Sequence, residues 1–385
     1  MQIHVAVDAV GIKHSGGATV LLDLLAATLT DDRVSRITVF SSPRSTRNFD
    51  LPASGRLVEI EQPLPERSYV HRLLWLRRNL GRECARVGAD VLFCATGIGT
   101  IPATTPYVTF VQQSLPFSRE ALQRCSAGLR LRMLVLRHLM EQSCANSWRV
   151  IVQTPTMLSW VAGAFRLKEE RCLIVMPTAR ELPSIDAASP VLGEMMTTPV
   201  GQRILYVGND SPYKNVDVAI RGLEYVRAAF PNAKLFITWP ATDTVPRDNG
   251  VVCLGYLGKA DLRKAYELAT VLIQPSLVES GPLTMSEAML VGTPVLVADR
   301  PYAHDMCEHA AVFFDPLNPR DFADKTVRLL QDSALRCELS RSGAALVAMR
   351  TTSRSYGGLL DVLVRAVQVS RLSRMARSND SLPSP

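Results

Sequence analysis

The chain has 385 residues, of which 47% are hydrophobic and 21% charged. This length exceeds one ordinary compact core and suits two domains, and the composition excludes a disordered or fibrous protein. No apolar run reaches the roughly 18 residues that a membrane-spanning helix needs. The N-terminus "MQIHVAVDAVG" has no basic leader, so we expect it to be a first β-strand rather than a signal peptide, and the protein to be cytoplasmic.

Short apolar runs alternate with helical patterns through the first half. In chain order they are "IHVAVDA", a helix over 17–30, "RITVFSS", "RLVEIE", a helix near 68–87, "VLFCAT", "YVTFVQQ", a helix near 119–142, "RVIVQTP" and "CLIVMP". Alternation of this kind is typical of crossover units and a parallel sheet. We therefore predict an α/β domain over residues 1–180, followed by a Pro- and Ser-containing linker at 181–200.

A second α/β series starts at "RILYVGN". It continues through a helix near 215–229, "KLFITW", "VVCLGYL", a helix near 260–269, "VLIQPS", a helix opened by "LTMSEAM", "PVLVAD", "AVFFD" and a helix near 320–332. This series predicts a second doubly wound domain over 201–352, with ligands bound beyond the carboxyl ends of its strands. We expect a further helix over 353–370, crossing back to the first domain, and a disordered polar tail over 371–385.

The net charge of +7 is concentrated in the first half, where 22 Lys and Arg face 14 Asp and Glu up to Arg180. Two stretches place arginines between apolar residues at helical spacing, which fits either solvated amphipathic helices or adhesion to an anionic membrane surface. A nucleic-acid partner is the weaker reading, because few aromatics are interleaved and no known module is present. The arginines concerned are Arg72, Arg77, Arg78, Arg130, Arg132 and Arg137.

Neither cysteines nor histidines show metal-site spacing. The eight cysteines form no C-x-x-C pair, the six histidines form no H-E-x-x-H pattern, and no D-x-D pair occurs. We therefore expect reduced thiols, and neither a metal site nor a cofactor.

The segment "SLVESGPLTMSEAMLVGTPVLVAD" places Glu279 and Glu287 around the start of a helix. Pro282 suits the first position of a helix and Gly292 suits its end. The backbone N–H groups of residues 283–285 would then point outward, and such a helix start favours a phosphate or diphosphate. Glu287, one turn further on, would be placed to accept hydrogen bonds from vicinal hydroxyls such as those of a ribose.

These residues, together with "RILYVGNDSPYKNVDVAIRGL", "VCLGYL", "GTPVLV" and "FFDP" in this order, resemble family 4 retaining glycosyltransferases. The resemblance implies the GT-B fold, two facing Rossmann-like doubly wound domains with a deep cleft between them. The form E-x-x-P, with "FVQQSLPF" and "DRPYAHDMCEHAAVFFDP", looks like enzymes of bacterial O-antigen and surface polysaccharide assembly, including mannosyltransferases.

The resemblance also implies roles for individual residues. Lys214 and Glu279 would be catalytic, Lys214 contacting the donor diphosphate and Glu279 lying by the donor sugar, while Glu287 would hold the ribose. Asn209 replaces an arginine that many relatives carry, and Gln112 and Gln113 replace a sugar-contacting histidine, which leaves Gln112 as a possible sugar contact. Arg203 and His304 are further possible contacts, each more simply read as structural. The remaining donor-binding residues implied are Gly16, Gly17, Gly281, Pro282, Leu283 and Thr284.

These expectations describe an enzyme that transfers a sugar from a nucleotide-sugar substrate to a lipid-linked saccharide, with retention and without a metal. A GDP-mannose-type donor is preferred and a UDP-sugar stays open. We expect the enzyme to work in lipopolysaccharide biosynthesis at the inner membrane, which it would reach through its basic N-terminal helices. A nucleotide-sugar epimerase of the same architecture is the alternative, and a nucleic-acid-binding protein is a weaker one.

Overall fold

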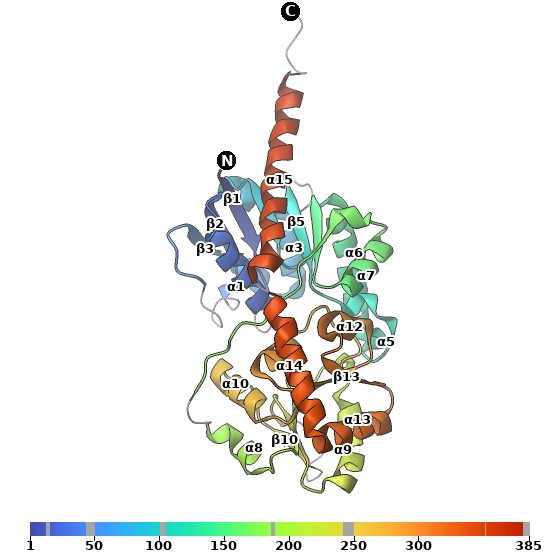
Figure 1. The fold of residues 1–385 in the computed structure, drawn as a ribbon. Coiled ribbons are helices and arrows are strands. Elements are labelled where there is room, and N and C mark those ends of the chain that lie inside the picture. Colours follow the sequence, from blue (N-terminus) through green and yellow to red (C-terminus); the bar gives the residue numbers. More distant parts are fainter. Residues whose placement is uncertain are drawn as a thin grey trace, which may run out of the picture. The chain divides into compact units, whose positions relative to one another are not determined.

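The structure is a computed structural model that describes residues 1–12, 16–43, 51–100, 105–185, 189–241, 250–350 and 352–379. Contacts within the chain divide it into two units. The first unit holds Met1–Phe117, Leu131–Pro177 and Thr352–Pro385, and the second holds Ser118–Arg130 and Thr178–Thr351. Each is an α/β unit built on a parallel sheet, which confirms the predicted fold class (Figure 1).

The first unit is built on seven parallel strands in the order β3-β2-β1-β4-β5-β6-β7. In the register of the sheet, Val5 of β1 pairs with Ile37 of β2 and with Val91 of β4. The strands are β1 (Ile3–Asp8), β2 (Val34–Ser41), β3 (Leu57–Glu61), β4 (Val91–Cys94), β5 (Tyr107–Val111), β6 (Arg149–Val152) and β7 (Cys172–Ile174).

Helices of the first unit follow most of these strands. They are α1 (Gly16–Leu29), η1 (Leu64–Glu66), α3 (Tyr69–Arg78), α4 (Leu80–Arg86), η2 (Leu115–Phe117), α6 (Ala127–Asn146, from Leu131 onward), α7 (Pro155–Phe165), η3 (Glu169–Arg171) and α15 (Thr352–Asn379). The helix expected near 68–87 is two helices that meet at Asn79, which serves as the C-cap of α3 and the N-cap of α4. Helix α7 was not among the expected elements.

Helix α15 completes the core of the first unit, although it lies at the far end of the sequence (Figure 1). Tyr356, Leu359 and Leu363 of α15 are buried with the apolar side chains of β1 and α1. Ion pairs add to this packing, since Arg33 contacts Asp361 at 2.8 Å and Arg371 contacts Asp90 at 2.7 Å. The disordered tail that we expected over 371–385 is wrong for residues 371–379, which continue this helix, and residues 380–385 lie outside the described residues.

The second unit has six parallel strands in the order β10-β9-β8-β11-β12-β13. Leu272 of the central strand β11 pairs with Leu205 on one side and Val295 on the other. Because both faces of this sheet are covered, its strands are apolar runs rather than alternating ones. The strands are β8 (Arg203–Tyr206), β9 (Lys234–Ile237), β10 (Val251–Cys253), β11 (Val271–Gln274), β12 (Val295–Ala298) and β13 (Ala311–Phe314).

Helices of the second unit include α5, which comes from the first half of the sequence. They are α5 (Arg119–Gln123), η4 (Pro190–Leu192), α8 (Gly193–Thr197), η5 (Pro212–Lys214), α9 (Val216–Ala229), α10 (Lys259–Leu268), α11 (Leu283–Val291), α12 (Pro301–Cys307), α13 (Pro319–Gln331) and α14 (Ser333–Met349). The helix predicted near 119–142 is thus the separate helices α5 and α6, and α14 was not expected.

The segment expected as a linker, 181–200, packs on the second unit where it is described. Arg263 donates a hydrogen bond to the carbonyl oxygen of Leu182 at 2.8 Å, and Lys234 contacts Glu194 at 2.9 Å. Residues 186–188 lie outside the described part. The residues from Thr178 onward therefore belong to the second unit, and the described part of 181–200 is not a separate linker between two domains.

Candidate functional site

The candidate site lies at the carboxyl edge of the second unit's sheet, in the loops that follow β8 and β11. Parallel strands bring such loops to one edge, where ligands of doubly wound sheets bind. The two loops contact each other through the backbone, since the N–H of Leu277 donates to the carbonyl oxygen of Tyr213 at 2.9 Å. This contact places Lys214 beside the loop that carries Glu279.

Lys214 and Glu279 form an ion pair with 2.5 Å between Nζ and Oε1, and their side chains keep only 16% and 12% of their exposure. Burial alone lowers the pKa of Lys214, but the carboxylate of Glu279 outweighs that effect and the pKa is raised. Lys214 is therefore held charged at neutral pH. The two residues proposed as catalytic from the sequence are thus in direct contact.

Gln274, the last residue of β11, holds this pair in place and was missed by the sequence reasoning. Its Nε2 donates to Oε1 of Glu279 at 3.0 Å and to Oγ of Ser276 at 2.8 Å. Its Oε1 accepts a hydrogen bond from Oγ1 of Thr284 at 3.1 Å. A buried amide thus connects the Glu279 carboxylate to the first turn of α11. The only available signal was a polar residue closing an otherwise apolar strand.

Helix α11 begins as the sequence predicted. Pro282 is the N-cap, with extended backbone and no side-chain cap, and Gly292 ends the helix with φ at 87°, a conformation that favours glycine. No acidic side chain lies in the first turn. The start of α11 therefore keeps the partial positive charge of its N–H groups, beside Thr284 and Gln274.

Glu287 is half-buried on α11 and accepts a hydrogen bond from Oη of Tyr266 at 2.9 Å. Burial raises the pKa of Glu287, while the Tyr266 hydroxyl and the charge of Lys259 offset part of this effect. The hydrogen bond engages Oε2, and Oε1 has no hydrogen-bond partner among the described residues. One carboxylate oxygen is thus available to accept a hydrogen bond from a ligand.

Other predicted donor-binding residues of this unit shape the loops. Asn209 is exposed, and its Oδ1 accepts a hydrogen bond from the N–H of Ser211 at 3.1 Å, which fixes the turn before η5. Gly281 and Pro282 are half-buried ahead of α11, while Leu283 is buried in the unit. The structure therefore brings Lys214, Glu279 and Thr284 together through Gln274. Among the described residues, the Asn209 side chain makes no hydrogen bond to these side chains.

Three predicted residues belong to the first unit. Gly16 and Gly17 are the first two residues of α1, rather than part of a glycine loop that precedes the helix as expected. A Cβ on Gly17 would meet Ile12 only at ordinary contact distance, 3.8 Å, so space does not demand glycine there. Gln112 follows β5 and donates from Nε2 to the carbonyl oxygen of Ala95 at 3.0 Å.

Arg203 and His304 have structural contacts. Arg203 is buried and donates to the carbonyl oxygens of Thr198, Met196 and Leu268. His304 stacks on Phe313 with ring centroids 4.2 Å apart, and its Nε2 lies 2.7 Å from Asp299. These contacts agree with the structural reading of both side chains.

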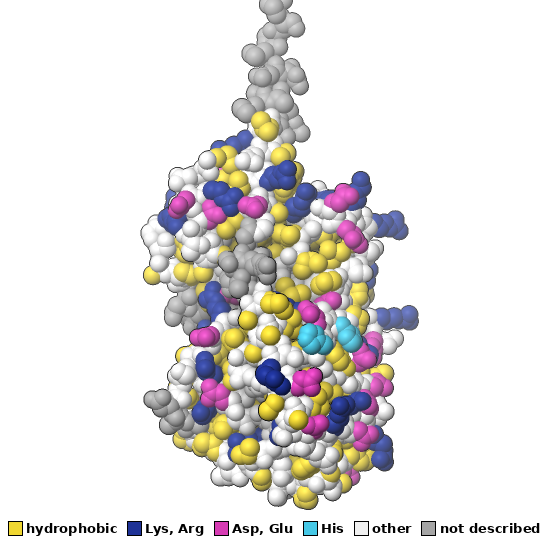
Figure 2. Space-filling model, viewed as in Figure 1, with side chains coloured by type: hydrophobic (Ala, Val, Ile, Leu, Met, Phe, Trp, Pro, Cys, Tyr) yellow, Lys and Arg dark blue, Asp and Glu magenta, His cyan; other side chains and the backbone are white. Residues whose placement is uncertain are grey.

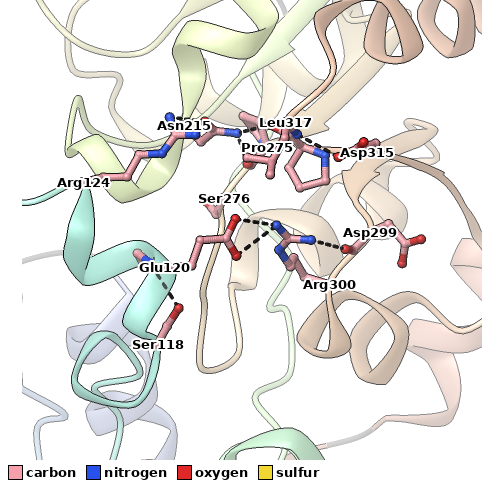
Figure 3. Close-up of polar contacts among 12 residues, drawn as sticks. Ser118, Glu120, Arg124, Asn215, Pro275, Ser276, Asp299, Arg300, Asp315 and Leu317 are labelled. Atoms are coloured by element: carbon pink, nitrogen blue, oxygen red, sulfur yellow. Dashed lines mark hydrogen bonds and ion pairs between the residues drawn. The ribbon is translucent and has the colours of Figure 1, made fainter.

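Helix α5 packs beside the loops that follow β8 and β12, which local sequence patterns did not indicate (Figure 3). Arg300 contacts both carboxylate oxygens of Glu120, at 2.8 and 3.0 Å, and Arg124 donates to Oδ1 of Asn215 at 3.1 Å. Asn215 has a left-handed backbone, with φ at 56°, and its Nδ2 donates to the carbonyl oxygens of Pro275 and Pro316. Asn215, the residue after Lys214, thus connects the loop that follows β8 to the loop before Glu279.

The described residues contain no group of three or more His, Cys, Asp or Glu side chains arranged to hold a metal ion. Within the same ranges, every helix is too short or too polar to cross a membrane.

Comparison with known proteins identifies the segment that carries this site. Residues 201–332 match the family model described as "Glycosyl transferases group 1". An uncharacterized glycosyltransferase of Methanocaldococcus jannaschii is 30% identical over 147 residues. That match spans 34% of this chain and 37% of the relative, so well under half of the relative's length is covered.

Solved structures of GT-B glycosyltransferases share the fold over almost the whole chain. WaaG, a glycosyltransferase involved in lipopolysaccharide biosynthesis, has a TM-score of 0.69 at 14% identity and covers 93% of this chain and 99% of its own. Anabaena HepE in complex with UDP and glucose has a TM-score of 0.67 at 15% identity, covering 94% and 100%. Sucrose-phosphate synthase from Thermosynechococcus elongatus has a TM-score of 0.66 at 16% identity, covering 98% and 100%. These likenesses show that the two units form the GT-B fold.

Proposed function

We propose that this protein is a retaining glycosyltransferase that moves a sugar from a nucleotide-sugar donor to a lipid-linked saccharide acceptor. The observation that carries the proposal is the Lys214–Glu279 pair, held by Gln274 against the start of α11. This arrangement lies within the segment that matches the group 1 family model. A buried cation and an uncapped helix start together suit the diphosphate of a nucleotide.

The proposed binding mode assigns each group one part of the donor. The N–H groups at the start of α11 bind the diphosphate, and Lys214 neutralises its charge. Glu287 accepts hydrogen bonds from the ribose hydroxyls through Oε1, the oxygen that Tyr266 leaves available. Glu279 uses Oε1 for Lys214 and Gln274, which leaves Oε2 to face the donor sugar.

Transfer requires the bond between the anomeric carbon and the diphosphate oxygen to break. Negative charge then grows on the departing nucleoside diphosphate, and fixed positive groups that stabilise this charge lower the barrier. Lys214 and the α11 start supply this stabilisation without rearranging, because Gln274 and Glu279 already hold them. The acceptor oxygen attacks the face that the diphosphate leaves, and its proton passes to the departing diphosphate, so the configuration is retained without a protein nucleophile. In this proposal no metal ion takes part.

Donor and acceptor follow from the family resemblance. A GDP-mannose-type sugar is our preferred donor, and a UDP-sugar is the second choice. The acceptor is a lipid-linked saccharide of bacterial O-antigen or lipopolysaccharide assembly, met at the cytoplasmic face of the inner membrane. Fold likeness to WaaG agrees with this setting, although it supports the architecture alone.

A nucleotide-sugar epimerase is the alternative from another enzyme class, because such an enzyme also binds a nucleotide-sugar through a two-domain fold. An epimerase would interconvert two nucleotide-sugars or release nucleotide without any acceptor. A nucleic-acid-binding protein is a weaker alternative, suggested only by the basic first half. Neither one accounts for the Lys214–Glu279 pair beside a helix start as simply as sugar transfer does.

A donor screen tests the proposal. Purified full-length protein is incubated with GDP- and UDP-sugars, with and without a membrane-extracted lipid acceptor, and released nucleoside diphosphate is measured. We expect acceptor-dependent release with one donor, unchanged by EDTA. Release that is independent of acceptor and accompanied by an isomerised donor would establish the epimerase instead, and activity lost with EDTA and restored by Mg²⁺ would overturn the metal-free mechanism.

A further inference from the structure

Helices α3 and α6 of the first unit lie side by side and present a joint outer surface. Near the start of α3, the guanidinium of Arg132 lies 4.1 Å from the ring centroid of Tyr69. Near its end, Nη2 of Arg77 donates to Oε1 of Gln142 at 2.6 Å. Contacts at both ends of α3 show that the two helices run alongside each other.

Large apolar side chains are exposed on this surface. On α3 they are spaced four residues apart, and on α6 they occupy positions i, i+3 and i+4, so each set follows one helix face. All five side chains are between 44% and 64% exposed. We call this set the apolar stripe, and it consists of Val70, Leu74, Leu131, Leu134 and Val135.

The apolar stripe lies in strongly basic surroundings. The two helices together contain six arginines and a single carboxylate, Glu141, which lies 3.9 Å from His138. Arg78 and Arg132 are exposed beside the stripe. Basic and acidic side chains are interspersed over the face of the molecule drawn in Figure 2. The charge of α3 and α6 is therefore complementary to an anionic partner.

Not every arginine that the sequence singled out faces solvent. Arg72 packs against Gly11, where a Cβ would lie 2.3 Å from its Nη1, and burial lowers the pKa of Arg72. Arg77 is engaged by Gln142. A membrane contact made through arginines alone would thus have fewer charges than the sequence suggested, and the exposed leucines become the more notable feature.

We propose that α3 and α6 dock on an anionic bilayer by inserting the apolar stripe among the lipid chains, while the surrounding arginines bind headgroups. Exposed Leu and Val flanked by arginines is the pattern of interfacial helices, whose arginine stems also cover apolar surface. A nucleic acid would use the arginines but leave the leucines in water. This inference rests on the proposed function, because a lipid-linked acceptor requires the enzyme to reach a membrane. It adds that the contact with the membrane is partly hydrophobic.

The hydrophobic component predicts a specific salt dependence. Screening at about 0.5 M salt weakens the contribution of the arginines, but leaves the insertion of apolar side chains in place. Each leucine that enters the bilayer contributes about tenfold to the partition coefficient. A fraction of the protein should therefore stay on vesicles at high salt.

Co-sedimentation of the full-length protein with phosphatidylglycerol–phosphatidylethanolamine vesicles tests this at low and high salt. The test variant is Leu131→Ser/Leu134→Ser, and the matched control is Val200→Ser/Leu317→Ser, which changes exposed apolar residues of the second unit. We expect the test variant to lose about a hundredfold in partitioning and all salt-resistant binding, with the control unchanged. Circular dichroism and thermal unfolding establish that both variants are folded.

Three results would overturn the docking surface. They are absence of wild-type binding at low salt, complete release of the wild type by salt, and equal binding of test variant and wild type. Light scattering tests whether a second copy of this chain covers the apolar stripe instead. If the wild type is a dimer that does not bind vesicles, and Leu131→Ser/Leu134→Ser abolishes the dimer, the stripe joins two copies of this chain. Transfer to detergent-solubilised acceptor is measured in parallel, so that a failed surface with intact transfer is distinguished from a failed function.

Discussion

The pair formed by Lys214 and Glu279 predicts a large stability cost when one partner is removed alone. Lys214→Met leaves the Glu279 carboxylate with little access to water and, among the described residues, with only the amide of Gln274 as a hydrogen-bond donor. Breaking a buried ion pair in this way costs about 3–5 kcal/mol. Because both side chains retain slight exposure, we expect the lower end of this range, about 3 kcal/mol.

Removal of both charges should cost much less. The double variant Lys214→Met/Glu279→Gln leaves no unpaired charge, so we expect a loss of about 1 kcal/mol and hence a coupling energy of several kcal/mol. Lys234→Met is the matched control, since Lys234 and Glu194 pair at a similar 2.9 Å but in a more exposed position. A surface pair contributes under about 1 kcal/mol.

Urea unfolding of the full-length chain measures these costs, and hydrogen exchange of peptides from 250–350 reads the second unit separately. The raised pKa of Lys214 makes its contribution fully present below the pKa of unfolded lysine, about 10.4, and lost only as pH rises through the folded value. The cost should thus be constant between pH 6 and 9. A cost no larger than that of Lys234→Met, or additive effects in the double variant, would refute the reasoning.

Three further changes have defined outcomes. Glu287→Gln should weaken binding of the nucleoside diphosphate in isothermal titration, yet it should stabilise the fold at pH 7. Because the pKa of Glu287 is raised, its ionisation destabilises the folded state, and this penalty appears as pH rises from about 4.3 through the folded pKa. Equal stability of both proteins at pH 7 would contradict the burial argument. Burial raises the pKa of Asp8 from 3.8 to about 6, so wild type should lose about 2 kcal/mol relative to Asp8→Asn between pH 4 and 7 in urea unfolding. Parallel pH profiles of the two proteins would count against this. Gln274→Leu should lower kcat about tenfold. Thr284→Val removes only the hydrogen bond between Gln274 and α11, so it should lower kcat less than about threefold. Equal effects of the two variants would mean that Gln274 acts on the helix and not on the Glu279 carboxylate.

The central strands of both sheets could be predicted because they are buried on both faces and read as apolar runs, while the edge strands β3, β7 and β10 are only partly buried. The helix boundaries were harder to predict. The break at Asn79 between α3 and α4 interrupts no hydrophobic pattern, and α5 separates from α6 because its contacts are with the second unit. Such divisions depend on packing between segments distant in sequence, which local patterns do not contain.

The local geometry of the candidate site could be predicted where single elements or adjacent strands determine it. The start of α11 follows from Pro282 and the end from Gly292, and Glu279 lies beside Lys214 because their loops follow two adjacent strands. The role of Gln274 could not be predicted, since its three hydrogen bonds exist only after the strand, the loop and the helix have assembled. The inward position of Arg72 likewise depends on how closely α3 approaches Gly11.

Return of α15 to the first unit gives the chain a defined order of assembly during synthesis. The residues that finish the first core, Tyr356, Leu359 and Leu363, leave the ribosome after the whole second unit has been made. Domains generally fold as units as the chain emerges, so the second unit can fold first while the earlier-made one waits with apolar surface uncovered. A nascent chain released before residue 352 would therefore be prone to aggregate, and an isolated first unit would need residues 352–379 joined to it.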